Sequence, residues 1–233
     1  MPAAPIPDNE TARLAALQNY KLLDTPPEQA YDDVTRLALI ICGTPIAIMT
    51  LVDKERQWFK SKLGLPGAQT PRDQAFCAHT VLQRELFVVE NALLDRRFAD
   101  NPLVTGDPHI RFYAGAPLVS PDGYGLGSIC VIDREPRQLN KEQSEALEAL
   151  ARVVVTQMEL SRVSAQLAEA AGNVKSLSGL LPICSYCKVI RNDQGYWQQV
   201  EVYVREHSQA EFSHSICPSC LGRHFPDLDL GET

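Results

Sequence analysis

Two pairs of strand-like runs limit the folds open to this chain more than any other feature. IAIMTLV (46–52) is separated from QWFKSKL (57–63) by a polar turn, and IRFYAGAPLVS (110–120) is joined to GYGLGSICVID (123–133) by the tight turn PDG. Such short connections join antiparallel neighbours, because a parallel pair needs a crossover of about a dozen residues or more. A further run, LFVVE (86–90), is a candidate strand between the two pairs. With helices before and after them, these runs predict an α+β fold with an antiparallel sheet and the helices to one side.

Two helices are predicted ahead of the strands. The first is expected at residues 10–23. The second is expected to begin at the capping-box pattern of Thr25 and Glu28 and to end before Pro45. Its apolar stripe has helical spacing and consists of Tyr31, Val34, Leu37, Ala38 and Ile41.

Three phrases then carry a resemblance to a known family: RDQAFCAHTV, LLDRRFADNPLV and RFYAGAPLVSPDGYGLGSICVIDREPRQL. With the long helix after them, they resemble a GAF domain, the small-molecule-sensing module of bacterial signalling proteins. The resemblance covers residues 10–162. It implies a six-stranded antiparallel sheet with helices on one face and a pocket for an unidentified small ligand on the other. We expect residues 1–9, ahead of this sensor domain, to be flexible.

The candidate ligand-binding residues of the sensor domain are Phe76, Cys77, His79, Asp95, Arg111 and Tyr113. Arg111 and Tyr113 share one face of their strand. An arginine on the pocket side would suit an anionic ligand such as a carboxylate or a phosphate. The alternative for Arg111 is a salt bridge to Asp95 or Asp133.

The cysteines of the sensor domain are predicted to be structural. Cys77 and His79 are two residues apart on a short predicted helix, so their side chains do not face the same way. This spacing disfavours a catalytic or haem-binding pair, and Cys77 is expected to be buried. Cys42 and Cys130 are expected to be core residues.

A third helix is predicted to begin at Asn140, where Gln143 completes a cap, and to continue to about residue 177. Apolar and small residues follow along it in alternating steps of three and four, at Val153, Thr156, Leu160, Val163, Leu167, Ala170, Val174 and Leu177. This is the spacing of a coiled coil. We therefore expect residues 163–178 to form a coiled-coil connector that joins two copies of the chain as a parallel homodimer.

Residues 179–229 are expected to form a small C-terminal module, followed by a tail at 230–233. Such a short segment buries too little apolar surface to be stable without a staple. Four of the chain's seven cysteines stand here in two CxxC pairs, Cys184 with Cys187 and Cys217 with Cys220. Two CxxC turns can present four thiolates to one tetrahedral zinc ion, so we predict one structural zinc per chain.

Other interpretations of the C-terminal module stay open. The cysteine pairs could be redox-active, or could bind iron or an iron–sulfur cluster, and His214 could replace one thiolate. A thioredoxin-like pair would need a βαβ setting, and none is predicted here. The phrases LPICSYCKVIR, GYWQQVEVYV and FSHSICPSC resemble an extension found after GAF, PAS and receiver domains of bacterial signalling proteins.

Composition excludes several classes of protein. The chain is 45% hydrophobic and 22% charged, which is typical of globular proteins. No apolar run approaches the roughly 18 residues that span a bilayer, and the first residues do not resemble a secretory signal. We therefore expect a cytoplasmic protein without membrane insertion. A net charge of −7 argues against a general nucleic-acid-binding surface.

Together these features predict a non-enzymatic sensor or adaptor of bacterial signal transduction, with no catalytic residues. Ligand binding would act through the dimeric helix, and the zinc module would contact a signalling partner such as a histidine kinase or another output protein. The alternative is a GAF-type enzyme such as a free methionine-(R)-sulfoxide reductase. Cys77 and Cys130 are its candidate catalytic cysteines.

Overall fold

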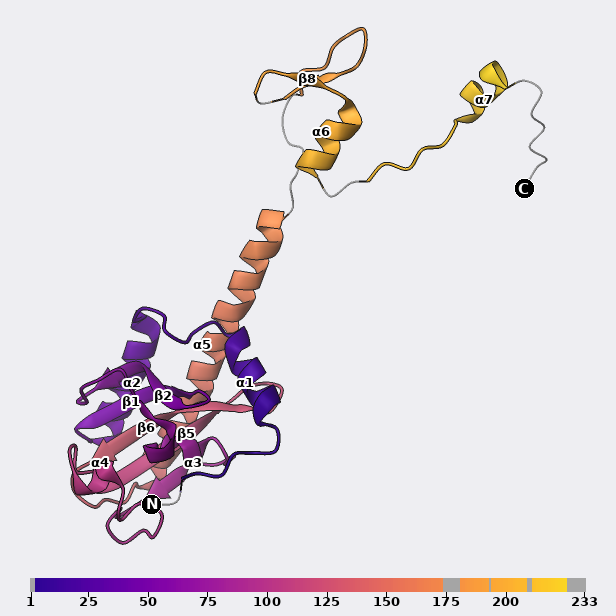
Figure 1. Ribbon diagram of the computed structural model, residues 1–233. Coiled ribbons are helices and arrows are strands. Elements are labelled where there is room, and N and C mark those ends of the chain that lie inside the picture. Colours follow the sequence, from indigo (N-terminus) through magenta and orange to yellow (C-terminus); the bar gives the residue numbers. More distant parts are fainter. Residues whose placement is uncertain (1–2, 174–180, 193, 209–210, 226–233) are drawn as a thin grey trace. The chain divides into compact units, whose positions relative to one another are not determined.

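The computed structural model describes residues 3–173, 181–192, 194–208 and 211–225. The chain divides into two compact units, at 1–166 and 167–233. The first unit contains a six-stranded sheet in the order β3-β2-β1-β6-β5-β4, and every neighbouring pair is antiparallel (Figure 1). Its strands are β1 (Ile46–Val52), β2 (Arg56–Leu63), β3 (Gln69–Pro71), β4 (Phe87–Val89), β5 (Phe112–Val119) and β6 (Gly125–Asp133). The predicted α+β class, both hairpins and the strand at 86–90 are confirmed.

The tight turn between β5 and β6 follows from its sequence. The backbone N–H of Ser120 donates to the carbonyl of Tyr124 (2.9 Å), and that of Gly123 donates to the carbonyl of Ser120 (2.8 Å). Gly123 has a φ of 85°, in the left-handed region that a residue without a Cβ adopts at little cost. The turn therefore sets the register of the hairpin.

Helices of different length cover the two faces of the sheet. The long helices α1 (Glu10–Asn19), α2 (Gln29–Cys42) and α5 (Lys141–Asn173) lie on one face, as predicted. The other face carries the short helices η1 (Arg72–Gln74), α3 (Cys77–Thr80) and α4 (Pro102–Thr105), with the loops between them. Side chains alternate along β1, so Met49 and Leu51 join the core under the long helices, whereas Ile46 and Ile48 join the core on the opposite face.

The first two helices differ from the prediction at their ends. α1 ends at Asn19, because Lys21 takes a left-handed backbone conformation. α2 begins at Gln29 with Glu28 as its N-cap, so the predicted capping box is wrong. The buried ammonium of Lys60 explains the difference, since it binds both the hydroxyl of Thr25 (2.6 Å) and the carboxylate of Glu28 (2.6 Å).

The start of the long helix α5 matches the prediction. The backbone N–H of Gln143 donates to Oδ1 of Asn140 (2.8 Å), and the N–H of Asn140 donates to Oε1 of Gln143 (3.1 Å). The helix is described as far as Asn173. The predicted seam positions Val174 and Leu177 lie outside the described residues.

The second unit contains short elements after the end of α5. β7 (Ile190–Arg191) pairs with β8 (Trp197–Gln198), and α6 (Val200–His207) and α7 (Pro218–His224) follow. Helix α6 covers the segment VEVYVREH, and its Tyr203 is buried. Among the helices in the described ranges, none is long and apolar enough to cross a membrane.

A network of charged side chains attaches α1 to the sheet. Arg13, only 2% exposed, forms a bidentate pair with Glu10 (2.7 and 2.8 Å) and donates to the carbonyl of Gly125 in β6 (3.2 Å). Arg72 binds the same carboxylate and donates to the carbonyl of Asp53 in the β1–β2 turn (3.2 Å). Burial raises the pKa of Glu10, but the hydrogen bonds and charges of the two arginines outweigh it and lower the pKa to about 2.

We expect Glu10→Gln to lower the free energy of unfolding at neutral pH by on the order of 3 kcal/mol, because it leaves the buried Arg13 without its counter-charge. Urea denaturation measures this. Because the pKa of Glu10 falls on folding from 4.5 to about 2, its contribution is complete above pH 4.5. The difference between wild type and variant should therefore shrink as the pH falls from 4.5 towards 2. The exposed Asp8→Asn is the matched control, and an equal loss in both variants would contradict the prediction.

Candidate functional site

A small cavity lies on the face of the sheet opposite the long helices. Its volume is about 30 Å³, enough for one or two water molecules. Strand alternation and the short helix α3 bring its lining together, which includes Ile48, Phe59, Phe76, Cys77, Tyr113 and Ile132. The lining is apolar apart from a few groups, as in many small-molecule sites.

Two polar side chains in the cavity wall were not among the residues predicted from the sequence. Gln57 is 5% exposed, and its Oε1 is buried without a hydrogen-bond partner among the described residues. Thr70 in β3 is paired in register with Gln57, and its Oγ1 is also buried without a hydrogen-bond partner among the described residues. A buried polar atom without a partner is costly. The alternation of side chains along β2 could have predicted that Gln57 lies on this face of the sheet. It could not have predicted that the amide oxygen has no partner.

The structure places three of the six predicted ligand-binding residues in the cavity wall, namely Phe76, Cys77 and Tyr113. His79 is buried outside this wall, with its ring edge against Phe98 (4.9 Å between centroids) and its Nε2 unpartnered within the described part of the chain. Burial and the nearby Arg97 lower the pKa of His79, which keeps the imidazole neutral at pH 7.

Arg111 and Asp95 lie outside the cavity wall and do not pair with each other. Arg111 donates to the carbonyls of Val104 (2.8 Å) and Ile110 (3.0 Å). Asp95 instead pairs with Arg97 (2.6 Å), which lowers the pKa of Asp95. Asp133 also pairs elsewhere, with Arg137. The prediction of a salt bridge for Arg111 is therefore wrong, because its guanidinium donates to backbone carbonyls instead.

Behind the cavity wall, the thiols of Cys77 and Cys130 face each other with 3.8 Å between their sulfurs. The phenol of Tyr113 donates to Sγ of Cys77 (3.2 Å) and forms a hydrogen bond with the hydroxyl of Thr80 (2.7 Å). The predicted burial of Cys77, Cys130 and Cys42 is confirmed. Their pairing was not predicted, because Cys77 and Cys130 are distant in sequence and come from α3 and β6.

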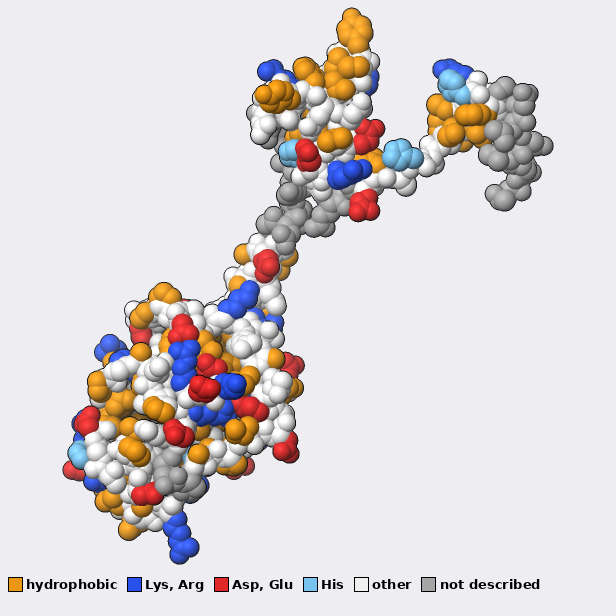
Figure 2. All heavy atoms as spheres, viewed as in Figure 1, with side chains coloured by type: hydrophobic (Ala, Val, Ile, Leu, Met, Phe, Trp, Pro, Cys, Tyr) orange, Lys and Arg blue, Asp and Glu red, His pale blue; other side chains and the backbone are white. Residues whose placement is uncertain are grey.

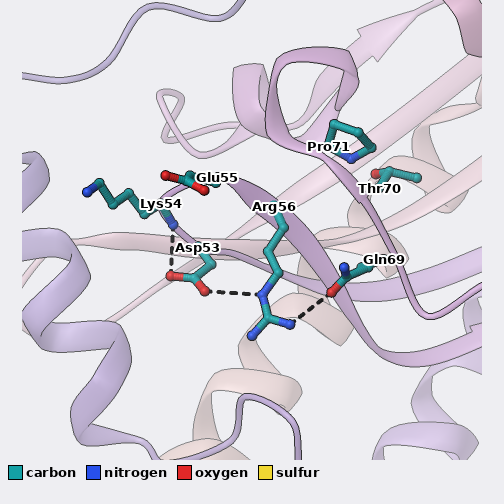
Figure 3. Close-up of a pocket in the computed structure, with 7 residues that line it drawn as sticks. All are labelled: Asp53, Lys54, Glu55, Arg56, Gln69, Thr70 and Pro71. Atoms are coloured by element: carbon teal, nitrogen blue, oxygen red, sulfur yellow. Dashed lines mark hydrogen bonds and ion pairs between the residues drawn. The ribbon is translucent and has the colours of Figure 1, made fainter.

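A larger but open cleft of about 580 Å³ lies at the β1–β2 turn and β3 (Figure 3). Two of its charged side chains, Asp53 and Arg56, already have partners. Arg56 binds Asp53 (3.3 Å) and Gln69 (2.8 Å), and outside the cleft it also pairs with Asp24 (2.6 Å). On the visible face of the first unit, acidic and basic side chains are interspersed (Figure 2). The cleft is therefore less suited than the cavity to hold a ligand.

Each CxxC pair of the second unit forms a tight turn. In the first, the N–H of Cys184 donates to the carbonyl of Val189 (2.8 Å), and the N–H of Lys188 donates back to that of Cys184 (3.0 Å). In the second, Cys217 is the N-cap of α7. The hydroxyl of Ser219 (3.1 Å) and the N–H of Cys220 lower the pKa of Cys217 to about 7. Within the described residues, no three His, Cys, Asp or Glu side chains lie together as a metal-binding group.

The model of the GAF domain family matches residues 26–158. The chain belongs to the GAF domain family. Over 173 residues it is also 42% identical to a cyclic di-GMP phosphodiesterase of Pseudomonas aeruginosa. The match covers 74% of this chain but only 30% of the relative, so the chain spans less than a third of that protein's length.

Several solved structures resemble this GAF protein at low identity. A free methionine-R-sulfoxide reductase of Neisseria meningitidis is 17% identical, with 70% of this chain and 99% of that chain covered and a TM-score of 0.49. The PixJ GAF domain of Thermosynechococcus elongatus is 12% identical, with 75% and 100% covered and a TM-score of 0.49. A GAF domain from an Acinetobacter phosphoenolpyruvate-protein phosphotransferase is 14% identical, with 67% and 96% covered and a TM-score of 0.48. None of these likenesses bears on the activity of this chain.

One expectation from the sequence is corrected by these comparisons. The chain was expected to be non-enzymatic because its motifs resemble those of sensors. The Pseudomonas relative, at 42% identity, is named as an enzyme, and this overturns that expectation. Sensor motifs describe one segment of a chain and do not exclude an enzymatic function of the protein that contains it.

We expect Gln57→Leu to raise the free energy of unfolding of the GAF domain by about 1 kcal/mol, because leucine removes a buried acceptor that has no partner. Thermal and chemical denaturation measure the change. Gln83→Leu, at an exposed glutamine, is the matched control and should give no gain. A clear loss of stability in Gln57→Leu would show that the amide has a structural partner, such as a bound water.

Proposed function

We propose that this chain is a sensory and signal-transmitting segment of a bacterial signalling protein that controls cyclic di-GMP hydrolysis. Its membership of the GAF family supports the sensory role. The 42% identity to a cyclic di-GMP phosphodiesterase supports the pathway. The shared segment makes up only 30% of that relative. The role that we propose for it is therefore to control hydrolysis, and to do so through a signalling partner.

The ligand site of the proposal is the cavity beside α3. Phe76, Cys77 and Tyr113 form its apolar wall, and Gln57 supplies a hydrogen-bonding group. At about 30 Å³ the cavity holds little more than water. The described conformation is therefore a closed one. A ligand would enter by displacing the short helix α4, which contributes Leu103 to the wall.

The observation that carries the proposal is a seam of exposed apolar residues along α5. The helix buries Leu147, Ala151, Val154 and Met158 against the sheet. On its opposite side, at 3.6 residues per turn, four large residues are exposed: Val153 (51%), Leu160 (62%), Val163 (42%) and Leu167 (65%). Their steps of seven, three and four residues are those of a coiled coil. A second copy of the chain is the partner that such a seam fits.

Helix α2 also exposes large apolar residues. Leu37, Ile40 and Ile41 are 47%, 63% and 41% exposed. The side chain of Gln143 donates to the carbonyl of Ile41 (3.1 Å), which holds the end of α2 beside the start of α5. We include these residues in the proposed homodimer interface.

We also propose that the second unit binds a structural zinc ion through Cys184, Cys187, Cys217 and Cys220. Four thiols in two tight turns are a donor set that zinc prefers. Figure 2 shows hydrophobic side chains at the surface of the second unit. Large apolar side chains exposed there include Tyr186 (96%), Trp197 (55%) and Ile216 (55%). Closure of the two turns around one ion would bury such side chains, as metal binding does in small domains that fold around it. A reducing cytoplasm would keep these thiols available.

The dimer is tested with Leu167→Lys, which places a charge in the seam. At tens of micromolar, we expect light scattering to show a dimer for the wild type and a shift towards monomer for the variant, because the charge must be desolvated on pairing. Ala165→Lys, on the side of α5 away from the seam, is the matched control and should stay dimeric. The melting temperature of the GAF domain should be unchanged. A monomeric wild type would contradict the proposed transmission through α5.

The metal is tested by elemental analysis of the purified chain. We expect one zinc per chain, and we expect Cys184→Ser to lose the metal and the protease resistance of the second unit, because a thiolate ligand is missing. Cys42→Ser, at a buried thiol of the GAF domain, is the matched control and should keep the zinc. Iron in place of zinc, or unchanged metal content in Cys184→Ser, would contradict the proposal.

A further inference from the structure

The thiols of Cys77 and Cys130 are placed to react with each other. Their sulfurs are 3.8 Å apart, and the two residues are 1% and 0% exposed. A disulfide bond has a length of about 2 Å, so the two side chains must rotate towards each other for the bond to form. α3 and β6 supply one thiol each, and both elements are held by the core around them.

The surroundings of the two thiols give them different roles. The phenol of Tyr113 donates to Cys77 and is itself held by Thr80. Burial raises the pKa of Cys77, but hydrogen bonds, in order of size those from Cys130, Ser128 and Tyr113, outweigh it and lower the pKa. The hydrogen bond to Cys77 and burial both raise the pKa of Cys130. Cys77 is therefore the nucleophile of the pair, and Cys130 is the thiol that resolves it.

The cavity gives a small oxidant access to Cys77. Cys77 lines the cavity, whose volume of about 30 Å³ suits a molecule of the size of water or hydrogen peroxide. Leu65, Thr70 and Leu103 also line it and are half-buried, so the cavity lies close to the surface. Free methionine sulfoxide or a peptide disulfide is far larger than this space. In this closed conformation, the size of the cavity therefore selects peroxide over bulky oxidants.

We infer that Cys77 and Cys130 form an oxidisable thiol pair, which hydrogen peroxide converts into an intramolecular disulfide. In the first step the sulfur of Cys77 attacks one peroxide oxygen, the O–O bond breaks, and the thiol proton leaves with the other oxygen as water. This gives a sulfenic acid on Cys77. In the second step the thiol of Cys130 attacks that sulfur, and the S–O bond breaks with release of a second water. Two thiols are thus oxidised to one disulfide while one peroxide is reduced to two waters.

The disulfide would change the face of the GAF domain that contains the proposed ligand site. It would tie α3 to the central strand β6 and withdraw the thiol of Cys77 from the cavity wall. Cys42 offers a comparison inside the same domain. It is also buried, but burial raises its pKa to about 11 and it does not line the cavity. It should therefore stay reduced under the same treatment.

The experiment treats the full native chain with millimolar hydrogen peroxide, quenches with catalase, then denatures and alkylates the remaining thiols. Trypsin places Cys77 in peptide 73–84, Cys130 in peptide 112–134 and Cys42 in peptide 37–54. Mass spectrometry should show peptides 73–84 and 112–134 joined by a bond that dithiothreitol breaks, with peptide 37–54 alkylated. Oxidised glutathione, a bulky oxidant, should leave both peptides alkylated.

Two variants separate the proposed chemistry from general oxidation. In Cys130→Ser the sulfenic acid of Cys77 cannot be resolved, so dimedone should label peptide 73–84. Tyr113→Phe removes the donor to Cys77 and should slow disulfide formation by about tenfold. Circular dichroism before treatment confirms that each variant is folded. The inference is overturned if both peptides stay alkylated when the C-terminal cysteines are oxidised, or if Cys42 is oxidised at the same rate.

Discussion

Burial of the central strands β1 and β6 on both of their faces is the constraint on which the first unit depends. Their alternating side chains supply two cores, one under the long helices and one around the cavity. In β6, for example, Ile129 and Val131 belong to the helix side, whereas Cys130 belongs to the cavity side. The proposed ligand site and the proposed signalling helix α5 therefore contact opposite faces of the same strands. A movement of these strands is the direct route between them.

The cysteines show how environment alone separates residues of one type. Cys42 lies in the core under the helices, where burial raises the pKa of its thiol. Cys77 and Cys130 are equally buried, but a second sulfur, a phenol and a cavity surround them. Cys217 sits at a helix N-terminus, where hydrogen bonds lower its pKa. For these environments we propose packing, peroxide chemistry and metal binding, in that order.

The sheet could be predicted from the sequence because the short connections between its strands leave few possible arrangements. The PDG turn and the polar turn at 53–56 allow only antiparallel neighbours, and both hairpins are confirmed. Predictions about the partners of individual polar side chains were less accurate. The capping box failed because Lys60 binds both of its side chains, and the expected salt bridge failed because loop carbonyls take the guanidinium of Arg111. Lys60 is 35 and 32 residues away from Thr25 and Glu28 in the sequence. Val104 and Ile110 are only 7 and 1 residues away from Arg111, but the conformation of the loop decides where their carbonyls point.

The sequence by itself determined the class of fold, the cap of α5 and the apolar seam along that helix, because each depends on spacing within a few turns. It also determined the two CxxC turns, whose geometry is local. Only the tertiary structure decided that Cys77 meets Cys130, that Gln57 faces a cavity without a partner, and that His79 and Arg111 stay outside it. These contacts join α3, β2, β5 and β6. They exist only when these elements are packed together, because side-chain packing in a core is set by all the elements around it at once.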